Sequence, residues 1–349
     1  MKKISHPTLD DVAHEAGVGT TTVSRVINGG DRVSPKTLAR VLQVIERLGY
    51  RPNQAARILK GHRARTVGLV IPNIADPFFA SCAEAAYAVA RANDSLLIVT
   101  ATHNDLDTEL ENLDVLLSHR TDGLLIAPAN PQSKALRDVL NRIAIPVVAI
   151  DRPVPNAIAS VVVDNYSAAH AATQHLTAHG YKRIACLTGG ETMLYTIRER
   201  TRGYRRAVEA AGFPCILDTS VNDYRSVESA ITNLLAEKHP PQALFTLKNS
   251  ITIHAFEALQ KLNVPVPSVL ALLGFDDFEL ASTLRPSISV VQQPIDEIGR
   301  VAAELLFNRL LDGSHAGNAA HSRRTQLVKL KTRLIERRSC GCVPGTGRT

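Results

Sequence analysis

Apolar residues in the first fifty positions recur at helical spacing in three short segments. The first segment covers 9–16 and can be capped by Thr8, and the second covers 20–27, after the glycine turn at 17–19. The third begins at Ser34-Pro35, a capping serine followed by proline at the first helical position, and runs to about Leu48. Its apolar residues are Leu38, Val41, Leu42, Ile45 and Leu48. Three short helices with a glycine turn between the first two predict an all-α helix-turn-helix module.

From Thr66 onward, short apolar runs alternate with helical stretches. Helical patterns include Phe79–Asn93, Asp107–Ser118 and Tyr166–His179. The expected strands are Val67–Ile71, Leu96–Val99, Gly123–Ala127, Val147–Ile150, Val161–Val163, Ile184–Leu187, Ala243–Leu247, Val269–Gly274 and Ser287–Val291. Apolar strands joined by helical crossovers indicate parallel sheets covered on both faces. We therefore expect a two-lobed, Rossmann-like α/β body of the periplasmic-binding-protein type, with a cleft between its lobes.

These patterns divide the chain into four parts. They are a helix-turn-helix headpiece over 1–52, a hinge helix and linker over 53–65, a ligand-binding and dimerisation domain over 66–340, and a flexible tail over 341–349. Lobe 1 is expected to hold about 66–163 with part of 292–325, and lobe 2 about 164–291 with the C-terminal strands. The hinge helix at 53–59 is too short to be stable alone, so DNA and a second copy of the chain would have to order it.

The positive charge of the chain is concentrated at its N-terminal end. Residues 1–65 contain 12 Lys and Arg against 5 Asp and Glu, whereas the remainder contains 28 of each. A basic module on a neutral body indicates a polyanionic partner for that module, since Lys and Arg neutralise phosphates. No signal-like apolar run follows Lys2-Lys3, and no stretch of about 18 apolar residues suggests a membrane span. We therefore expect a cytoplasmic protein with no membrane partner.

On the second predicted helix, Thr20, Thr21 and Arg25 share the exposed face. Arginine pairs with guanine through two hydrogen bonds, and threonine offers a methyl or hydroxyl group, so we expect these side chains to contact base edges in the major groove. The alternative is that the threonines only cap the helix and that the arginine is a solvated charge. In the hinge, Leu59 is apolar and expected to be exposed, so it could wedge between base pairs from the minor groove.

The segment Thr8-Leu-Asp-Asp-Val-Ala-His-Glu-Ala-Gly-Val-Gly-Thr-Thr-Thr-Val-Ser-Arg-Val-Ile-Asn28, with Tyr50-Arg-Pro-Asn53 and Ala56–Leu59, resembles the headpiece and hinge of the lactose/galactose/purine repressor family. The resemblance continues to about Cys340. It implies that Thr20, Thr21 and Arg25 read bases and that Leu59 is the minor-groove wedge. It also assigns DNA docking to Leu9, Asn28, Ser34, Thr37, Tyr50 and Asn53. Thr8 and Ala56 lie in the matching segments and are likewise expected to bind DNA.

Ligands of open α/β sheets bind beyond the carboxyl ends of the strands, so the residues that follow each strand are the candidates. The effector-site residues predicted in this way are Asn73, Asp76, Phe78, Phe79, Asp151, Asp164, Lys248, Asn249 and Asp276, and an arginine-rich stretch adds Arg198 and Arg200. Aromatic rings with carboxylates, amides and arginines suit a polyhydroxy ligand. The family resemblance favours Asp276, Arg200 and the segment 73–79 in particular.

Each of these residues has a structural alternative. Phe78 or Phe79 could be a core residue, Asp164 and Asp276 could be caps or turn formers, and Arg200 could lie on a solvated helix face. Lys248-Asn249 departs from the family, whose members usually carry Asn-Asp or a second amide there. A lysine near Arg200 favours an anionic ligand such as a sugar acid, although Lys248 could instead face Asp164 or Asp276.

The other chemistry-bearing residues indicate neither catalysis nor a metal. The glycines at 17 and 19 lack the preceding strand and third glycine of a dinucleotide loop, and no nucleophile elbow or phosphate loop occurs. His175 and His179 have the i, i+4 spacing of zinc ligands but no third ligand nearby in the sequence, so we expect surface histidines. The five cysteines lack metal-site spacing, and Cys340 and Cys342 lie in a glycine- and proline-rich tail. We expect free thiols, no metal, no cofactor and no enzyme activity.

The predicted function is that of a sequence-specific transcriptional repressor controlled by a small metabolite, a sugar or a sugar acid. Two-fold dimers read palindromic operators in double-stranded DNA, so we expect a homodimer formed through the lobe 1 helix Phe79–Ala90. The alanine-rich face of that helix (Ala83, Ala86, Ala90) could equally pack inside the lobe. Two alternatives stay open: a DNA-binding regulator that ignores metabolites, and a solute-binding protein, against which the basic headpiece argues.

Overall fold

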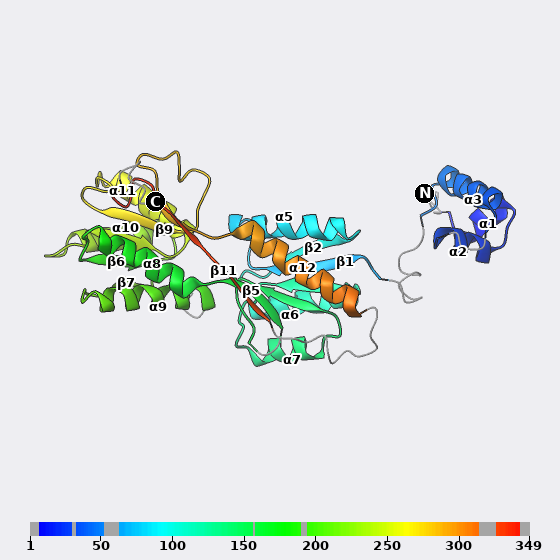
Figure 1. The fold of residues 1–349 in the computed structure, drawn as a ribbon, viewed down its shortest axis with the longest axis horizontal. Helices are drawn as coiled ribbons and strands as arrows, with labels where there is room; N and C mark the ends of the chain where they lie inside the picture. The colour runs from blue at the N-terminus through cyan, green and yellow to red at the C-terminus, as the bar shows by residue number, and fades with distance from the viewer. Residues whose placement is uncertain are drawn as a thin grey trace. The chain divides into compact units, whose positions relative to one another are not determined.

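The computed structural model describes residues 7–29, 33–51, 63–155, 158–189, 194–313 and 326–342. The chain forms two compact units, Met1–Ala64 and Arg65–Thr349. The first unit is all-α, and the second contains two sheets covered by helices, one parallel and one with a single antiparallel edge strand (Figure 1). The predicted fold class, a helix-turn-helix module followed by a two-lobed α/β body, is therefore confirmed.

Three helices form the N-terminal unit: α1 (Leu9–Ala16), α2 (Thr20–Ile27) and α3 (Pro35–Leu48). Gly17 ends α1 in the left-handed conformation, which glycine adopts without strain, and so makes the tight turn into α2 possible. Val12, Val23 and Val41, one from each helix, are fully buried in the core of the unit.

The apolar residues of α3 do not all face the core of the unit. Leu42 is 50% exposed, and Val44 is buried in its place. Successive helical residues are rotated by about 100°, so Val44, three residues after Val41, lies on nearly the same face, whereas Leu42 is turned away from it.

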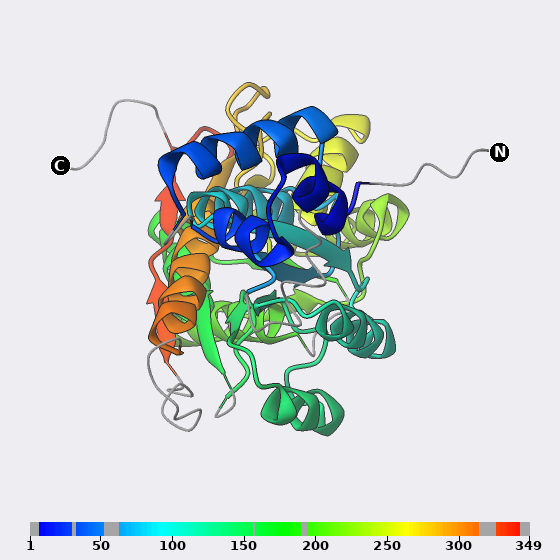
Figure 2. The same cartoon turned by 90° about the vertical axis from the view of Figure 1, so that its right-hand side faces the viewer.

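Lobe 1 is a six-stranded parallel sheet between two pairs of helices. Helices α5 (Pro77–Ala92) and α12 (Ile295–Gly313) cover one face, and α6 (Leu106–Ser118) and α7 (Lys134–Arg142) cover the other (Figures 1 and 2). The strand order is β11 (Leu327–Leu330), β5 (Ala159–Val163), β4 (Val147–Ile150), β3 (Gly123–Ile126), β1 (Thr66–Ile71) and β2 (Leu96–Ala101). Burial of the central strands on both faces explains their near-continuous apolar sequences.

Lobe 2 repeats this three-layer arrangement. Helices α8 (Asn165–Ala178) and α9 (Tyr195–Ala210) cover one face of its sheet, and α10 (Tyr224–Leu235) and α11 (Asn249–Lys261) cover the other. The strand order is β12 (Arg333–Ile335), β10 (Ser289–Gln292), β9 (Ala271–Phe275), β8 (Ala243–Thr246), β6 (Ile184–Leu187) and β7 (Ile216–Asp218). All neighbours are parallel except β12, which runs antiparallel to β10.

The chain crosses between the lobes three times: after β5, after β10, and between β11 and β12. Because of the third crossing, β11 lies in lobe 1, whereas the sequence pattern places both C-terminal strands in lobe 2. The pattern also misses β7, because this strand has three half-buried residues and no apolar run.

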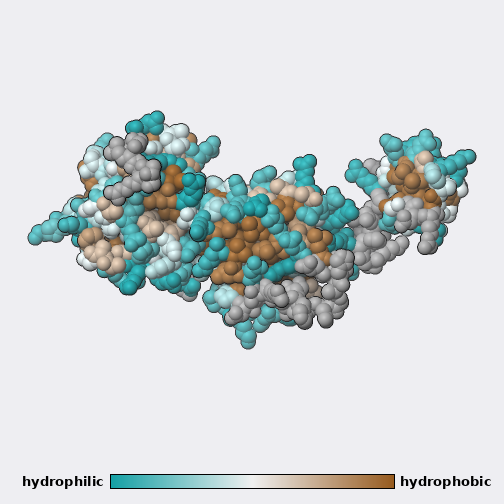
Figure 3. Space-filling model, viewed as in Figure 1, coloured by the Kyte–Doolittle hydropathy of each residue, from teal (hydrophilic) through white to brown (hydrophobic). Residues whose placement is uncertain are grey.

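Lobe 1 exposes apolar side chains over one helix and along one edge strand. Hydrophobic side chains gather over the face that carries α12, where Val301 and Leu305 are partly exposed (Figure 3). The edge strand β2 exposes Leu96 and Ile98. The alanine-rich side of α5 is used inside the lobe instead, because its Ala86 and Ala90 are buried in the core. Among the described residues, no helix combines the length and apolar character needed to cross a bilayer.

Candidate ligand pocket and nucleic-acid interface

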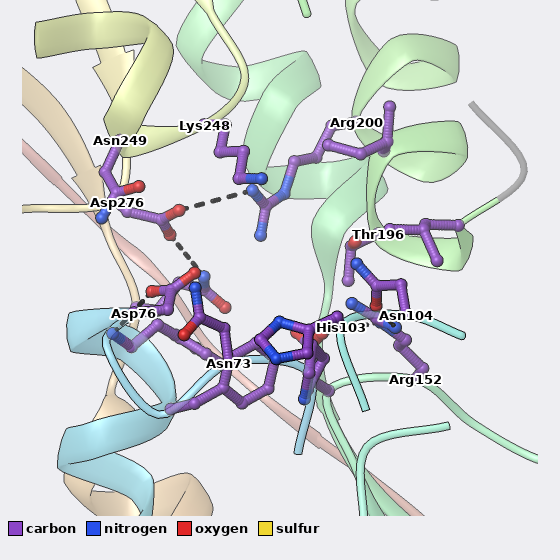
Figure 4. Close-up of a pocket in the computed structure, with 17 residues that line it drawn as sticks. Asn73, Asp76, His103, Asn104, Arg152, Thr196, Arg200, Lys248, Asn249 and Asp276 are labelled. Carbon is purple, nitrogen blue, oxygen red and sulfur yellow. Dashed lines mark hydrogen bonds and ion pairs between the residues drawn. The ribbon is translucent and has the colours of Figure 1, made fainter. Parts of the chain in front are cut away.

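A cavity of about 230 Å³ lies where the carboxyl ends of strands from both lobes face each other. Its walls carry amides, carboxylates, cationic side chains and two phenylalanine rings (Figure 4). The residues that line it are Pro72, Asn73, Asp76, Phe78, Phe79, His103, Asn104, Asp151, Arg152, Leu194, Thr196, Ile197, Arg200, Lys248, Asn249, Asp276 and Gln293. A concave site with a few convergent polar groups and apolar rings is typical of small-molecule binding.

Arg200, from α9, is held rigidly on the lobe 2 side of this pocket. Its guanidinium donates hydrogen bonds of 2.8 Å to Oδ1 of Asn165 and of 2.8 Å to the carbonyl of Leu247. It also stacks 3.7 Å above the centroid of the Phe275 ring, and its Nη1 lies 3.6 Å from Oδ2 of Asp276. A planar guanidinium fixed in this way keeps its N–H groups in one direction, which suits paired hydrogen bonds to neighbouring hydroxyls of a ligand.

Asp276 is the acidic partner of Arg200 and is itself buried. The side-chain amide of Gln293, from the segment between β10 and α12, donates a hydrogen bond to Oδ1 of Asp276. The amide oxygen of Gln293 is buried and accepts no hydrogen bond within the described part of the chain. A buried acceptor of this kind at a cavity wall is available to a ligand hydroxyl.

Arg152 has the corresponding position in lobe 1. Its Nη1 donates to Oδ1 of Asn104 at 2.7 Å and to the carbonyl of Pro128 at 2.9 Å. Its Nε lies 3.4 Å from Oδ2 of Asp151, which is an ion pair without hydrogen-bond geometry. Burial raises the pKa of Asp151, and the neighbouring Arg152 opposes that rise. Each lobe therefore presents one buried arginine–aspartate pair to the cavity.

Asp151 and Asp276 also share an uncommon backbone conformation, with φ of 63° and 73°. Asp151 follows the last residue of β4 and Asp276 the last residue of β9. Left-handed backbone costs an L-residue on the order of 1 kcal/mol, although aspartate tolerates it better than most. Such conformations concentrate at binding sites, where the surrounding fold holds them in place.

The segment 73–79 closes the pocket on the lobe 1 side. Asp76 caps α5 by accepting a hydrogen bond of 3.0 Å from the backbone N–H of Phe78, and burial raises the pKa of this carboxyl group. Phe78 and Phe79 pack edge to face, with their ring centroids 5.0 Å apart. Both rings are buried in the lobe 1 core and also line the cavity, so the core and ligand interpretations apply to the same side chains.

The charges at the cavity wall are balanced. Three carboxylates (Asp76, Asp151, Asp276) face three cationic groups (Arg152, Arg200, Lys248). Lys248 precedes α11, and its ammonium points toward Arg200 and Asp276 in Figure 4. Its charge also lowers the pKa of Asp76, against the larger effect of burial. Neither charge predominates around the cavity.

Two of the predicted effector residues are not among those that line the cavity. Asp164 caps α8, with Oδ1 accepting the backbone N–H of Ser167 at 3.2 Å, which is its structural alternative. Arg198 has a side chain 52% exposed and lies 3.6 Å from the carboxylate of Glu199. Asn165, next to Asp164, is the residue that contacts Arg200. The other nine predicted residues all line the cavity.

Sequence reasoning missed five polar residues of the cavity wall: His103, Asn104, Arg152, Thr196 and Gln293. All except Thr196, which lies on α9, come shortly after a strand, so the rule that predicted the other residues could have found those four. His103 and Asn104 both have positive φ, which the sequence does not reveal.

In the N-terminal unit, α2 presents the residues predicted to read bases. Thr21 and Arg25 are exposed, and Thr20 is half-buried. The helix begins after Gly19 without a side-chain cap, so the threonines do not have the capping role of the alternative interpretation. An exposed arginine and threonine on one helical face are suited to contacts with base edges.

The predicted docking residues have local roles in the same unit. Thr8 and Asp11 form a reciprocal capping box, in which the Thr8 hydroxyl donates to the Asp11 carboxylate at 2.7 Å. Ser34 caps α3 by accepting the backbone N–H of Thr37, and the Asn28 amide donates to the Ser24 carbonyl. Leu9 and Tyr50 pack against the core. Asn53, Ala56 and Leu59 lie outside the described residues, so their predicted hinge contacts stay predictions.

Comparisons with known proteins agree with both units. Residues 8–53 match the model of bacterial regulatory proteins of the lacI family, and residues 64–336 match periplasmic binding proteins and the sugar binding domain of the LacI family. The chain belongs to the lacI family of bacterial regulatory proteins. The resemblance stated from the sequence is thus confirmed, and the protein is a DNA-binding transcriptional repressor whose activity depends on a small-molecule effector.

Several relatives cover most of this LacI-family chain. Catabolite control protein A of Priestia megaterium is 34% identical over 304 residues, 86% of this chain and 91% of that protein. The ribose operon repressor of Escherichia coli K12 is 32% identical over 316 residues, 87% of this chain and 93% of that one. A cellobiose complex of the transcriptional regulator CelR aligns with a TM-score of 0.69 at 29% identity, covering 95% and 99% of the two chains. A lac repressor dimer bound to operator aligns with a TM-score of 0.84 at 22% identity over 96% and 99%, which supports the shared fold.

Proposed function

We propose that the effector of this repressor is a neutral sugar or sugar-like polyol of about monosaccharide size. The balance of charge in the cavity carries the proposal: Arg200 and Arg152 each already face a buried carboxylate. A neutral polyol keeps these pairs intact and exchanges hydrogen bonds with both members, whereas an anion would compete with a carboxylate for the same guanidinium. The phenylalanine rings offer apolar faces to the C–H groups of a sugar ring.

A sugar acid is a second candidate, and Lys248 favours it. The ammonium of Lys248 points toward the same side of the cavity as Arg200 (Figure 4). Two cations close together can bind a carboxylate without breaking the Arg200–Asp276 pair. The two candidates therefore differ in whether ligand binding depends on Lys248.

A thermal-shift screen of the purified full-length protein tests both candidates. The panel contains pentoses, hexoses, disaccharides, the matching sugar acids and purines, and a ligand of the native state raises Tm with its concentration. We expect a neutral sugar to stabilise the wild type and Lys248→Asn, and to have little effect on Asp276→Asn. Stabilisation by a sugar acid alone, lost in Lys248→Asn but kept in the exposed control Lys238→Asn, would establish the second candidate. Stabilisation by purines alone would overturn both.

We also propose that this protein binds a palindromic operator as a homodimer through lobe 1. Lobe 1 exposes apolar side chains over α12 and along the edge strand β2, and surfaces of this kind mark association sites. Sedimentation equilibrium is expected to give a dimer for the wild type and a weakened dimer for Leu96→Lys or Val301→Lys. A monomeric wild type at micromolar concentration would refute the proposal.

Linkage relates the two binding events. If the effector changes operator affinity by some factor, operator DNA changes effector affinity by the same factor. Titration of labelled operator with and without the screened compound therefore measures this factor, and coinciding isotherms would show that the compound is not the effector. The remaining alternative, an exported solute-binding protein, does not account for the basic residues of the first unit or for the exposed Arg25 on α2.

A further inference from the structure

Four potential metal ligands come together on lobe 2, away from the effector cavity. They are His175 and His179 of the α8 C-terminal end, and Cys340 and Cys342 of the turn that follows β12. Their ligand atoms all lie within 4.8 Å of one another. We propose that these four residues bind a structural Zn²⁺ ion.

The distances between the ligand atoms approach those of a tetrahedral zinc site. Cys342 Sγ lies 3.2 Å from His179 Nε2 and 3.6 Å from His175 Nε2. Cys340 Sγ lies 3.3 Å from His175 Nε2 and 3.3 Å from Cys342 Sγ. With Zn–S bonds of about 2.3 Å and Zn–N bonds of about 2.1 Å, the edges of the tetrahedron are about 3.4–3.8 Å long. Small side-chain adjustments therefore suffice to place one ion among the four atoms.

Residues around the cluster hold the ligands in place. Nδ1 of His175 faces Oε1 of Glu336 at 3.7 Å, while Nε2 of the same ring faces the two thiols. Cys340 is fully buried, and its sulfur accepts a hydrogen bond of 3.0 Å from the hydroxyl of Ser289. This carboxylate–histidine arrangement is what supports the ligands of zinc sites in proteins.

The turn between the two cysteines requires the glycine that it contains. Gly341 has φ of 96°, and a Cβ at this position would lie 2.7 Å from Oη of Tyr181. The Tyr181 ring in turn stacks on the ring of His179. The backbone is therefore shaped to direct Cys340 and Cys342 to the same side, toward the histidines.

The sequence-based interpretation treated the two pairs separately. The histidines have zinc-type i, i+4 spacing, and the cysteines are 161 or more residues away along the chain. The fold brings them together because the last strand, β12, returns the chain to lobe 2 beside α8. Two histidines and two cysteines with no open position form a closed site, which is typical of structural rather than catalytic zinc. The ion would fasten the chain after β12 to α8.

Zinc binding to the reduced full-length protein tests this proposal. After treatment with a chelator and dialysis, the wild type is expected to bind one Zn²⁺ per chain, with a rise in Tm, and Co²⁺ should give the visible and near-ultraviolet bands of a tetrahedral thiolate site. Cys342→Ser and His179→Gln, at the two more exposed positions, should lower Zn²⁺ affinity more than about 100-fold, and Glu336→Gln about 10- to 100-fold. The control Cys215→Ser, which removes an exposed cysteine outside the cluster, should bind as the wild type does.

Two results would overturn the proposal. One is equal Zn²⁺ binding by the wild type and Cys342→Ser, which would place any bound ion elsewhere. The other is a Cys340–Cys342 disulfide, seen by mass spectrometry in protein kept with Zn²⁺ and without added oxidant, which would make the pair a redox couple. None of these measurements depends on the identity of the effector.

Discussion

Replacing Glu109 by glutamine is expected to change how the stability of lobe 1 depends on pH. Glu109 lies on α6 with no exposed surface, and its Oε1 accepts a hydrogen bond of 3.1 Å from the backbone N–H of Ala129. Its other oxygen, Oε2, has no hydrogen-bond partner among the described residues. Burial raises the pKa of this carboxyl group from 4.5 to about 7, although the Ala129 N–H and Arg152 favour the charged form.

The sign and the size of the effect follow from that pKa. Because the folded state binds the proton more tightly than the unfolded state, stability is fully present below pH 4.5 and falls as the pH rises toward 7. The rise of about 2.5 pH units corresponds to about 3 kcal/mol at 1.4 kcal/mol per unit. Glutamine does not titrate, and its oxygen can still accept the Ala129 N–H. The variant should therefore match the wild type near pH 4.5 and be more stable by up to about 3 kcal/mol at pH 8.

Thermal unfolding of both proteins between pH 4.5 and 8.5 measures the difference. For a unit as long as Arg65–Thr349, about 3 kcal/mol corresponds to a Tm difference of roughly 5 °C. Glu111→Gln, at an exposed position of the same helix, controls for the loss of one carboxyl group. A Tm difference between Glu109→Gln and the wild type that stays constant with pH, or that shrinks toward pH 8, would refute the reasoning.

Three further changes test other parts of the structure. Arg200→Met should lower the free energy of unfolding by about 3 kcal/mol, because it leaves one buried carboxylate and two buried acceptors without their partner. Arg202→Ala, at a side chain 62% exposed, should lower it by less than about 1 kcal/mol. Urea unfolding measures both variants, and equal losses would contradict the structural role given to Arg200. Gly203→Ala places a Cβ against the backbone carbonyl of Tyr166 where α8 and α9 pack, so the soluble yield or Tm should drop sharply. An unchanged Tm would show that the two helices can move apart without loss of stability. Arg25→Ala should weaken binding to an operator selected from random DNA by about 1–3 kcal/mol, with little change in Tm. Fluorescence anisotropy measures the binding, and an unchanged sequence preference would show that Arg25 reads no base.

The architecture could be predicted from the sequence because its signals are local. Short apolar runs between helical patterns marked nearly every strand, and the glycine turn with Ser34-Pro35 marked the helices of the first unit. The same dependence on local pattern explains the misses. Strand β7 has no apolar run to recognise, and β11 belongs to lobe 1 only because it pairs with β5, more than 160 residues earlier.

The cavity was partly predictable for a related reason. A residue that shortly follows a strand can be found from the sequence, and eight of the 17 residues that line the cavity were found in this way. Which of two neighbours faces the cavity depends on backbone dihedrals and on partners elsewhere in the fold. Asp164 and Asn165 illustrate this: the aspartate caps α8, while the asparagine contacts Arg200. The histidine and cysteine pairs could not be combined at all without the return of β12 to lobe 2.

The cavity contacts also explain how a ligand can act on the connections between the lobes. Arg200 holds Asn165, the first residue of α8 after the first crossing, and Asp276 is held by Gln293, which lies in the second crossing. The backbone N–H of Asp164 donates to the carbonyl of Leu330 at 3.3 Å, so the first crossing is tied to the third as well. A ligand that repositions the Arg200–Asp276 pair therefore acts directly on two of the three crossings and on the third through Asp164. If the lobes move when a ligand binds, these side chains can transmit the movement without either core, because they are bonded to the segments that connect the lobes.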